Sequence, residues 1–205
     1  MKIRKTVVAL FLLALCSTVV STFAQDKPKP QVAPAAPSLD ESMKAMEKAA
    51  APGEQQKRLA RLAGDWTFTN TMWMDPSQPP TTSTGTMHGE TLMGGRYVEH
   101  TWKGSMMGMP FEGRGTDGYD NVAKHYVSSW VDNMGTGIMY QTGSCDAAGN
   151  VCHYSGDIWD PMSGQKSTTR STITWTGDNT FKNEMFGPGP DGKEVKWMEI
   201  VAKRK

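Results

Sequence analysis

The sequence lacks several features that would announce a chemical activity. No Gly-x-Ser-x-Gly elbow occurs, and no glycine loop opens a helix, so serine-hydrolase and phosphate-binding chemistry have no motif to support them. The longest apolar run, Val7–Val20, has about 14 residues, whereas roughly 20 are needed to span a bilayer. We therefore expect no stable membrane anchor. Cysteine is scarce as well, because only Cys145 and Cys152 lie beyond the N-terminal segment.

An excess of charge of one sign is also lacking. Residues 25–205 carry 19 basic and 21 acidic side chains, a formal net charge of −2. Nucleic-acid-binding domains display a basic surface, so the composition excludes this class. It does not favour acidic substrates or anionic membranes either.

The first 24 residues have the three regions of a secretory signal. Lys2, Arg4 and Lys5 form a basic region, the apolar run follows, and small residues precede a cleavage site after Ala24. Leu15 is too bulky for the position before a lipid-modified cysteine, so we do not expect lipidation of Cys16. The sequence predicts a periplasmic or secreted protein.

Between the signal and the strands lie a linker and a helical segment. Residues 25–37 are rich in proline and alanine, a composition typical of an extended linker. Ser38 and Glu41 have the spacing of a capping box and predict a helix over Leu39–Ala51. After Pro52-Gly53, a second helix is expected over Glu54–Leu62.

From Gly64 onward the pattern is that of strands separated by Gly, Pro, Asn and Asp turns. Ten strands are predicted: Asp65–Trp73, Thr81–Leu92, Arg96–Lys103, Phe111–Tyr119, His125–Val131, Gly137–Cys145, Val151–Ile158, Lys166–Thr176, Thr180–Phe186 and Glu194–Lys203. We expect an all-β fold, an antiparallel up-and-down β-barrel of about ten strands, because closure removes exposed edges. The expected divisions are a signal peptide (1–24), a linker (25–37), a helical lead (38–63) and a β-barrel domain (64–205).

The two ends of the β region resemble the lipocalin and calycin superfamily. Gly64-Asp65-Trp66 matches its Gly-x-Trp at the first strand, and Arg204 lies on the apolar face of the last predicted strand. The resemblance implies a cation–π contact of Arg204 on Trp66 that closes one end of the barrel. The alternative is an ordinary core tryptophan and a solvated arginine.

A closer resemblance covers Leu59–Lys205. It is carried by several specific runs: Leu92–Tyr97, Gly108–Gly115, Gly118–Asn121, Tyr126–Asp132, Thr136–Met139 and Gly189–Lys193. These runs are similar to the uncharacterised bacterial family named domain of unknown function 1579. The resemblance implies a calycin-like β-barrel, usually secreted, with no established activity. The cysteine pair, the helical lead and the proline linker depart from the family pattern.

The central predicted hairpin supplies a candidate ligand pocket. Alternation places Tyr126, Trp130 and Asp132 on one face of a strand, where aromatic bulk and a polar group would suit a small apolar or amphipathic molecule. Glu112 and Arg114, on the preceding strand, are expected nearby. In the alternative interpretation the two aromatic residues are core, Asp132 caps a turn and Arg114 pairs with Glu112.

Cys145 and Cys152 flank a turn-rich link between two strands, and in an oxidising compartment this predicts a hairpin disulfide. The alternative is a metal site that includes both cysteines and His153, although a fourth ligand is lacking.

No cofactor is predicted, but two were considered. The 15 methionines offer thioethers that select Cu(I), without clustered histidines. Barrels of the resembled superfamily can hold a haem through one histidine, for which His100 or His125 would be the axial ligand.

The favoured function is binding of a small molecule inside the barrel. An enzyme of unassigned class using the same pocket, and a structural barrel filled by its own side chains, are the alternatives. The sequence does not indicate an oligomeric state.

Overall fold

The structure is a computed structural model that describes residues 36–74, 77–160, 163–189 and 191–205. The predicted signal peptide, and the predicted linker up to residue 35, lie outside the described residues. Ser38–Lys205 form one unit of the chain. Among the residues that are described, no helix has the length and apolar character to cross a membrane.

Two short helices precede the strands. Helix α1 (Leu39–Ala50) begins with the predicted capping box: Ser38 Oγ accepts from Glu41 N at 3.3 Å, and Glu41 Oε2 accepts from Ser38 N at 2.8 Å. Helix α2 (Glu54–Leu59) tightens into a 3₁₀ turn, η1 (Ala60–Leu62). The second predicted helix is therefore one α-helical segment followed by a tighter one.

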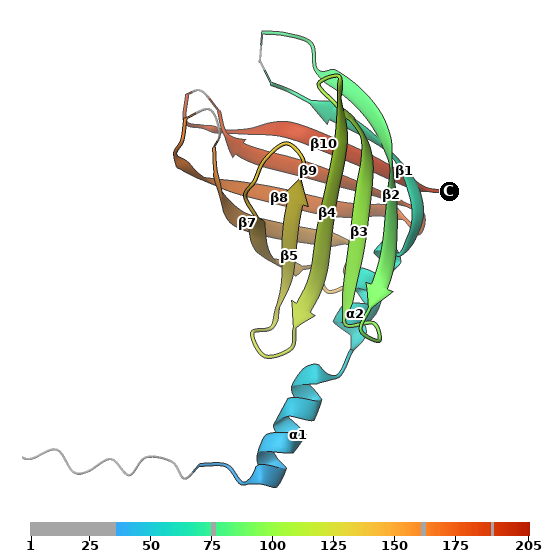
Figure 1. Cartoon of the computed structure of the whole chain (residues 1–205), viewed down its shortest axis with the longest axis vertical. Helices are drawn as coiled ribbons and strands as arrows, with labels where there is room; N and C mark the ends of the chain where they lie inside the picture. The colour runs from blue at the N-terminus through green and yellow to red at the C-terminus, as the bar shows by residue number, and fades with distance from the viewer. Residues whose placement is uncertain (1–35, 75–76, 161–162, 190) are drawn as a thin grey trace, which may run out of the picture. The chain divides into compact units, whose positions relative to one another are not determined.

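Ten antiparallel strands close into a barrel, as the sequence predicts (Figure 1). Each strand pairs with its neighbours in sequence, and β1 pairs with β10 to complete the ring. The strands are β1 (Gly64–Met72), β2 (Thr81–Leu92), β3 (Tyr97–Met106), β4 (Met109–Asp120), β5 (His125–Asp132), β6 (Met139–Cys145), β7 (Val151–Trp159), β8 (Lys166–Gly177), β9 (Thr180–Pro188) and β10 (Glu194–Arg204). Many strand ends differ from the predicted ones by one to three residues. Most of these strands extend further than predicted, as β4 does at both ends, and a few are shorter, as β3 is at Arg96.

Local turn chemistry explains why consecutive strands form hairpins. Between β2 and β3, Gly94 and Gly95 have φ values of 68° and 83°, a region that glycine enters without steric cost. Between β4 and β5, Asp120 Oδ1 accepts from Val122 N at 2.7 Å and from Ala123 N at 2.9 Å. An aspartate that satisfies the turn amides in this way fixes the connection between its flanking strands.

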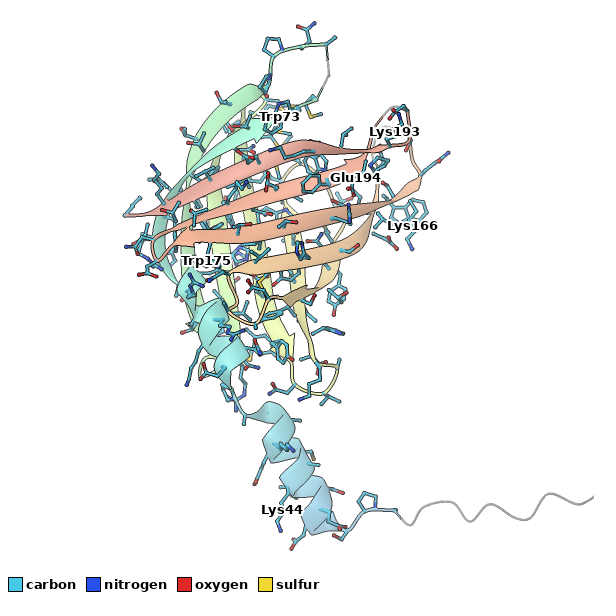
Figure 2. All side chains as sticks on the ribbon, turned by 180° about the vertical axis from the view of Figure 1, so that it is seen from behind. Lys44, Trp73, Lys166, Trp175, Lys193 and Glu194 are labelled. Carbon is cyan, nitrogen blue, oxygen red and sulfur yellow. A yellow bond between two sulfur atoms is a disulfide. The ribbon has the colours of Figure 1, made fainter. Side chains whose placement is uncertain are left out.

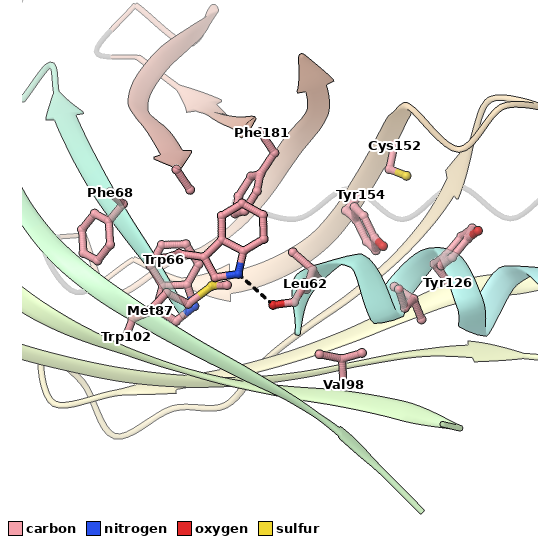
Figure 3. Packing of buried hydrophobic residues seen from close by; sticks show 12 residues of the cluster. Leu62, Trp66, Phe68, Met87, Val98, Trp102, Tyr126, Cys152, Tyr154 and Phe181 are labelled. Atoms are coloured by element: carbon pink, nitrogen blue, oxygen red, sulfur yellow. Dashed lines mark hydrogen bonds between the residues drawn. The ribbon is translucent and has the colours of Figure 1, made fainter. Parts of the chain in front are cut away.

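The main hydrophobic core gathers around Trp66, which is completely buried (Figure 3). Its indole Nε1 donates to Leu62 O at 3.1 Å, so the polar atom of the ring is satisfied by η1. The ring of Phe181 meets it edge to face at 5.2 Å between centroids. Burial of an aromatic side chain of this kind contributes about 2 to 3 kcal/mol. A second, smaller core cluster consists of Met72, Met185 and Met198.

Helix α2 and η1 lie at one end of the barrel, which we call the helix end, close to Trp175; Trp73 lies at the opposite end (Figure 2). Gln56 is 4% exposed and joins the helix to the barrel, donating from Nε2 to Tyr119 O at 3.1 Å. Arg58 Nη2 donates to Ala147 O at 2.8 Å. These contacts attach the helical segment to two turns of the barrel.

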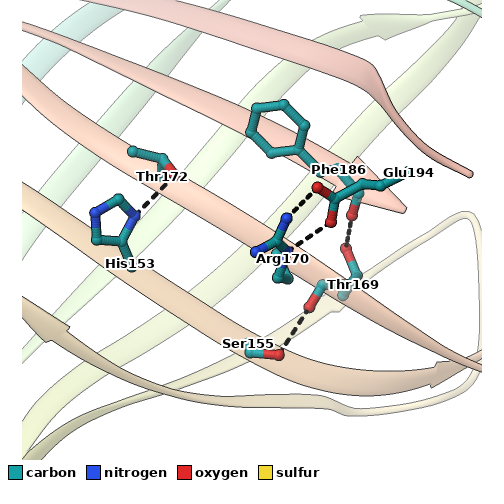
Figure 4. A network of polar contacts seen from close by, with 7 residues as sticks. All are labelled: His153, Ser155, Thr169, Arg170, Thr172, Phe186 and Glu194. Carbon is teal, nitrogen blue, oxygen red and sulfur yellow. Dashed lines mark hydrogen bonds and ion pairs between the residues drawn. The ribbon is translucent and has the colours of Figure 1, made fainter. Parts of the chain in front are cut away.

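Polar contacts also connect the strands β7, β8, β9 and β10 (Figure 4). Arg170 on β8 forms a two-pronged ion pair with Glu194 on β10, at 2.5 Å from Nε to Oε1. Thr169, on the inner face, donates to Phe186 O at 3.1 Å. Both partners of the ion pair are substantially exposed, so it contributes about 1 kcal/mol or less.

Candidate functional site

The helix end is closed by Arg204. Its guanidinium carbon lies 4.2 Å from the centroid of the Trp66 ring, and its Nη1 and Nη2 donate to Ala63 O at 2.6 Å and Arg61 O at 2.7 Å. The cation–π geometry implied by the superfamily resemblance is therefore present. Arg204 and η1 therefore cover Trp66, which has no exposed surface.

The two cysteines are bonded to each other. Cys145 and Cys152 are directly opposite on β6 and β7, and they form a disulfide that closes this hairpin. The alternative metal site is wrong, because the two sulfur atoms are engaged in the disulfide. His153 lies on the exposed side, where Nδ1 is 3.1 Å from Thr172 Oγ1.

Three of the predicted pocket residues point into the barrel. On β5, Tyr126 is buried, and Trp130 and Asp132 are partly buried. Trp130 Nε1 donates to Asp132 Oδ2 at 2.7 Å, and Asp132 Oδ1 accepts from Met134 N at 2.9 Å. Asp132 therefore both orients the indole and caps the turn that follows β5.

Glu112 and Arg114 do not belong to this lining. Their side chains are 56% and 58% exposed, and they lie on the outer face of β4. Arg114 Nη1 lies 3.4 Å from Glu99 Oε1, and Glu112 Oε1 lies 3.9 Å from Lys103 Nζ. The prediction that these two residues line the interior is wrong, since side chains alternate along a strand and the opposite face of β4 points inward.

The inward face of β4 instead makes room for rings from its neighbours. A Cβ atom on Gly113 would lie 2.3 Å from the Trp130 ring, and one on Gly115 would lie 2.2 Å from Cε1 of His100. At each of these two glycines, a ring from an adjacent strand therefore packs directly against the backbone. A side chain at either position would displace that ring.

A buried pair of polar side chains, one from β3 and one from β4, lies inside the barrel. His100 is 8% exposed and Asp117 is 6% exposed, and His100 Nε2 lies 3.1 Å from Asp117 Oδ2. On the other side of the imidazole, Trp102 Nε1 donates to His100 Nδ1 at 2.8 Å. Because an indole N–H can only donate, Nδ1 is the acceptor and the ring hydrogen lies on Nε2, facing the carboxylate.

This arrangement bears on the haem hypothesis. Both nitrogens of His100 are engaged, so neither offers a free lone pair to a metal ion. His125, the other candidate, is the first residue of β5 and faces away from the interior, because the alternate residues Tyr126 and Trp130 point inward. The structure therefore gives neither histidine the geometry of an axial ligand.

Tyr154 on β7 faces the same interior from the opposite wall. Burial raises the pKa of its phenol far above the usual value, and the negative charge of Asp117 raises it further. The phenol of Tyr126 also has a raised pKa, mainly because of burial, and its hydroxyl donates to Gln55 Oε1 of α2. Both phenols are therefore neutral donors at physiological pH.

Three amide side chains point inward, each with a buried polar atom that lacks a partner within the described part of the chain. The atoms are Asn70 Oδ1 on β1, Gln141 Nε2 on β6 and Asn183 Oδ1 on β9. Asn70 and Asn183 flank Ile200 on the two sides of β10, whereas β6 lies across the barrel from β1. An unpartnered buried amide costs about 1 to 3 kcal/mol, so three of them in one interior require an explanation.

A small cavity lies near the two phenols and Asp117. This cavity, of about 30 Å³, lies beneath the helix end and is bordered by residues that include Leu59, Asp117, Tyr126 and Tyr154. This volume holds about one water molecule. A larger depression, of about 590 Å³, lies over β1, β2 and β10 and is bordered mainly by outward-facing residues such as Thr69 and Thr84.

The comparisons with known proteins agree with this fold. A family model described as "Protein of unknown function (DUF1579)" matches residues 51–204. The chain belongs to this family. The DUF1579 resemblance drawn from the sequence is thereby confirmed. A search of curated proteins found no match.

Among solved structures, this DUF1579 member is similar to the crystal structure of Rv2717c from M. tuberculosis. The TM-score is 0.57 at 12% identity, over 76% of this chain and 99% of that chain. A redesigned β-barrel, b11L5F_LGL, reaches a TM-score of 0.37 at 17% identity, over 72% of this chain and 95% of that chain. EF1p2_mFAP2b bound to DFHBI reaches 0.40 at 16% identity, over 73% and 99%. The similarity to Rv2717c is a similarity of fold.

Sequence reasoning did not find the His100–Asp117 pair or the three unpartnered amides. Alternation along β4 groups Asp117 with Phe111 and Tyr119 on the face opposite Glu112 and Arg114, and the structure shows that this is the inner face. The pairing of Asp117 with His100 depends on the register between β3 and β4, in which Gly115 lies opposite His100. The sequence contains no local signal of that register.

Proposed function

We propose that this protein binds a small neutral amphipathic molecule inside its barrel. The observation that supports this proposal is the set of three inward-pointing amides whose polar atoms have no partner among the residues that the structure describes. Asn70 is 3% exposed and Gln141 is 5% exposed, so bulk water does not satisfy these groups. A ligand with both a hydrogen-bond donor and an acceptor would pair with the two asparagine oxygens and the Gln141 nitrogen.

The charged groups of the interior argue against an anionic ligand. Nδ1 of His100 carries no hydrogen because it accepts from Trp102, so the imidazole does not balance the carboxylate of Asp117, and the carboxylate of Asp132 accepts only from N–H groups. An anionic ligand would meet these carboxylates without a counter-ion, which is unfavourable in a buried site. A neutral ligand needs no counter-ion.

The apolar part of the ligand would contact a group of aromatic rings. Trp102 and Trp130 meet at 6.3 Å between centroids, and Phe111 stacks on Trp130 at 6.4 Å. Phe111 and Trp130 are only partly buried although they point inward, so part of this aromatic surface remains free for contact. Export after cleavage near Ala24 belongs to the same proposal and would place the protein among extracellular or periplasmic small molecules.

The cavity of about 30 Å³ favours the alternative, a barrel filled by its own side chains. The two functions differ in a measurable way. If the protein binds a ligand, the interior rings move to admit it and the unpartnered amides become paired. If the barrel is filled, no small molecule enters and the amides stay unpaired.

Native mass spectrometry of protein purified from the periplasm of its own host tests the proposal. We expect a bound molecule of fixed mass that organic extraction removes. The extracted protein is then titrated with N-phenyl-1-naphthylamine, a neutral fluorescent probe, while the emission of the probe is monitored. Asn70→Leu should lower the affinity for the probe at least fivefold. Thr69→Val, which alters the adjacent outward-facing residue, should leave this affinity unchanged. A protein that carries no small molecule and does not bind the probe would show that the barrel is filled.

A further inference from the structure

The smaller core cluster joins three methionines that are far apart in the sequence. Met72 on β1 lies directly opposite Met198 on β10, and Met198 lies opposite Met185 on β9. All three side chains point inward and pack against one another, with exposed fractions of 6% to 8%. Met106 on β3 packs against the same group as a partly buried neighbour. We call Met72, Met185 and Met198 the thioether cluster.

We propose that the thioether cluster is a binding site for a soft monovalent metal ion, Cu(I) or Ag(I). Directly opposed residues on adjacent strands have Cβ atoms about 4.5 to 5.5 Å apart, so three flexible side chains from three adjacent strands can converge on one point. Thioether sulfur is a soft ligand that selects Cu(I) over hard divalent cations. The site consists of neutral ligands only and needs no histidine, which is why the isolated histidines of the sequence do not argue against it.

The surroundings of the cluster suit a cation. Asn70 and Asn183 lie two residues before Met72 and Met185 on the same strand faces, and each presents an unpartnered carbonyl oxygen with a partial negative charge. The neighbouring ammonium group of Lys196 is neutralised, because it lies 3.1 Å from Glu184 Oε1 and 2.6 Å from Glu199 Oε2. No competing thiol exists among the described residues, since Cys145 and Cys152 form a disulfide.

The alternative is that methionine serves here only as apolar filling, for which its flexible side chain is well suited. Apolar filling does not require sulfur. Leucine at the central position, Met198, would preserve the packing and remove one of the three thioether ligands, which weakens metal binding. The two interpretations therefore predict opposite results for the same substitution.

The test is a titration of the signal-free chain, labelled with ¹³C at the methionine methyl groups, with silver nitrate in chloride-free buffer. We expect one equivalent of Ag(I) to shift the methyl signals of Met72, Met185 and Met198 together. Cu(I), held under anaerobic conditions against a bathocuproine competitor, should bind with the same stoichiometry. Met198→Leu should lower the affinity for both ions at least tenfold. The control Met134→Leu, in a loop outside the cluster, should not change either affinity.

Two further variants keep the test decisive if Met198→Leu does not fold. Met72→Leu and Met185→Leu each remove one outer ligand. Each should lower the affinity for Ag(I) by a smaller factor and leave the circular dichroism spectrum unchanged. The proposal would be overturned if the affinity of all folded variants equalled that of the parent protein. It would also be overturned if silver shifted mainly the exposed Met107 and Met109.

Discussion

Asn70 offers a direct test of whether the interior is built for a partner that the protein itself does not supply. Its side-chain oxygen is buried without a hydrogen-bond partner in the described part of the chain, while the side chain is 3% exposed. Replacing it with leucine removes the unpartnered group and adds apolar surface. In the ligand-free protein we therefore expect Asn70→Leu to raise the free energy of unfolding, although most substitutions of buried residues lower it.

The magnitude follows from the cost of the unpartnered group. Leaving a buried polar group unsatisfied costs about 1 to 3 kcal/mol. Removing it gains this free energy, but the extra volume of leucine causes packing strain that offsets part of the gain. A net gain of about 1 to 2 kcal/mol remains, which corresponds to a rise in Tm of about 2 to 6 °C for a chain of this size. Asn70→Val, whose side chain is smaller, separates the polar effect from overpacking.

Gln56 provides the matched control. It is buried to a similar degree, at 4% exposure, but its amide is satisfied: Oε1 accepts from Gly53 N at 2.8 Å, and Nε2 donates to Tyr119 O at 3.1 Å. Gln56→Leu leaves those backbone groups without partners, so we expect a loss of about 2 to 3 kcal/mol. The two substitutions make the same chemical change and should shift stability in opposite directions.

The measurement is urea unfolding of extracted, ligand-free protein, followed by tryptophan fluorescence and circular dichroism, with the slopes compared among variants. If Asn70→Leu and Asn70→Val both destabilise the protein by more than about 1 kcal/mol, the oxygen is satisfied in solution and our reasoning about the interior fails. If both substitutions stabilise the protein and also lower its affinity for the probe, the amide is retained for binding at the expense of stability.

Three further predictions concern the frame of the barrel. Replacing Cys145 and Cys152 with serine should lower the free energy of unfolding by about 2.5 kcal/mol on the chain-entropy model, and the parent protein should show no reaction with a thiol reagent before reduction. Arg204→Ala removes a cation–π contact and two hydrogen bonds to backbone carbonyls, so we expect a loss of about 2 to 3 kcal/mol and greater solvent exposure of the adjacent tryptophan, measured by acrylamide quenching. Gly115→Ala places a Cβ atom 2.2 Å from an imidazole carbon and should cost about 1 to 3 kcal/mol in urea unfolding, whereas Gly135→Ala, with no atom within 4 Å, should change stability little.

The elements of the fold were predictable because their signals are local. Alternating polar and apolar residues identified all ten strands, and the capping box at Ser38 and Glu41 identified the start of α1. The disulfide was predictable for the same reason, since Cys145 and Cys152 lie seven residues apart in one hairpin. Errors were confined to element ends such as Arg96, where a turn residue resembles a strand residue.

The candidate site was only half predictable. Alternation within β5 correctly grouped Tyr126, Trp130 and Asp132, because neighbouring side chains on one strand have fixed relative directions. It could not say which face of β4 would be the inner one. Glu112 and Arg114 were therefore placed in the interior, although their charged side chains lie on the outer surface.

The sequence by itself determined the strands, their turns, the hairpin disulfide and membership of the family, since each depends on residues that are close together or on extended matching runs. Only the tertiary structure decided which side chains meet inside the barrel. His100 meets Asp117, and Met72 meets Met198, through strand register and ring closure. Register is set jointly by all the pairings around the ring, so the interior chemistry emerges only when β1 and β10 join.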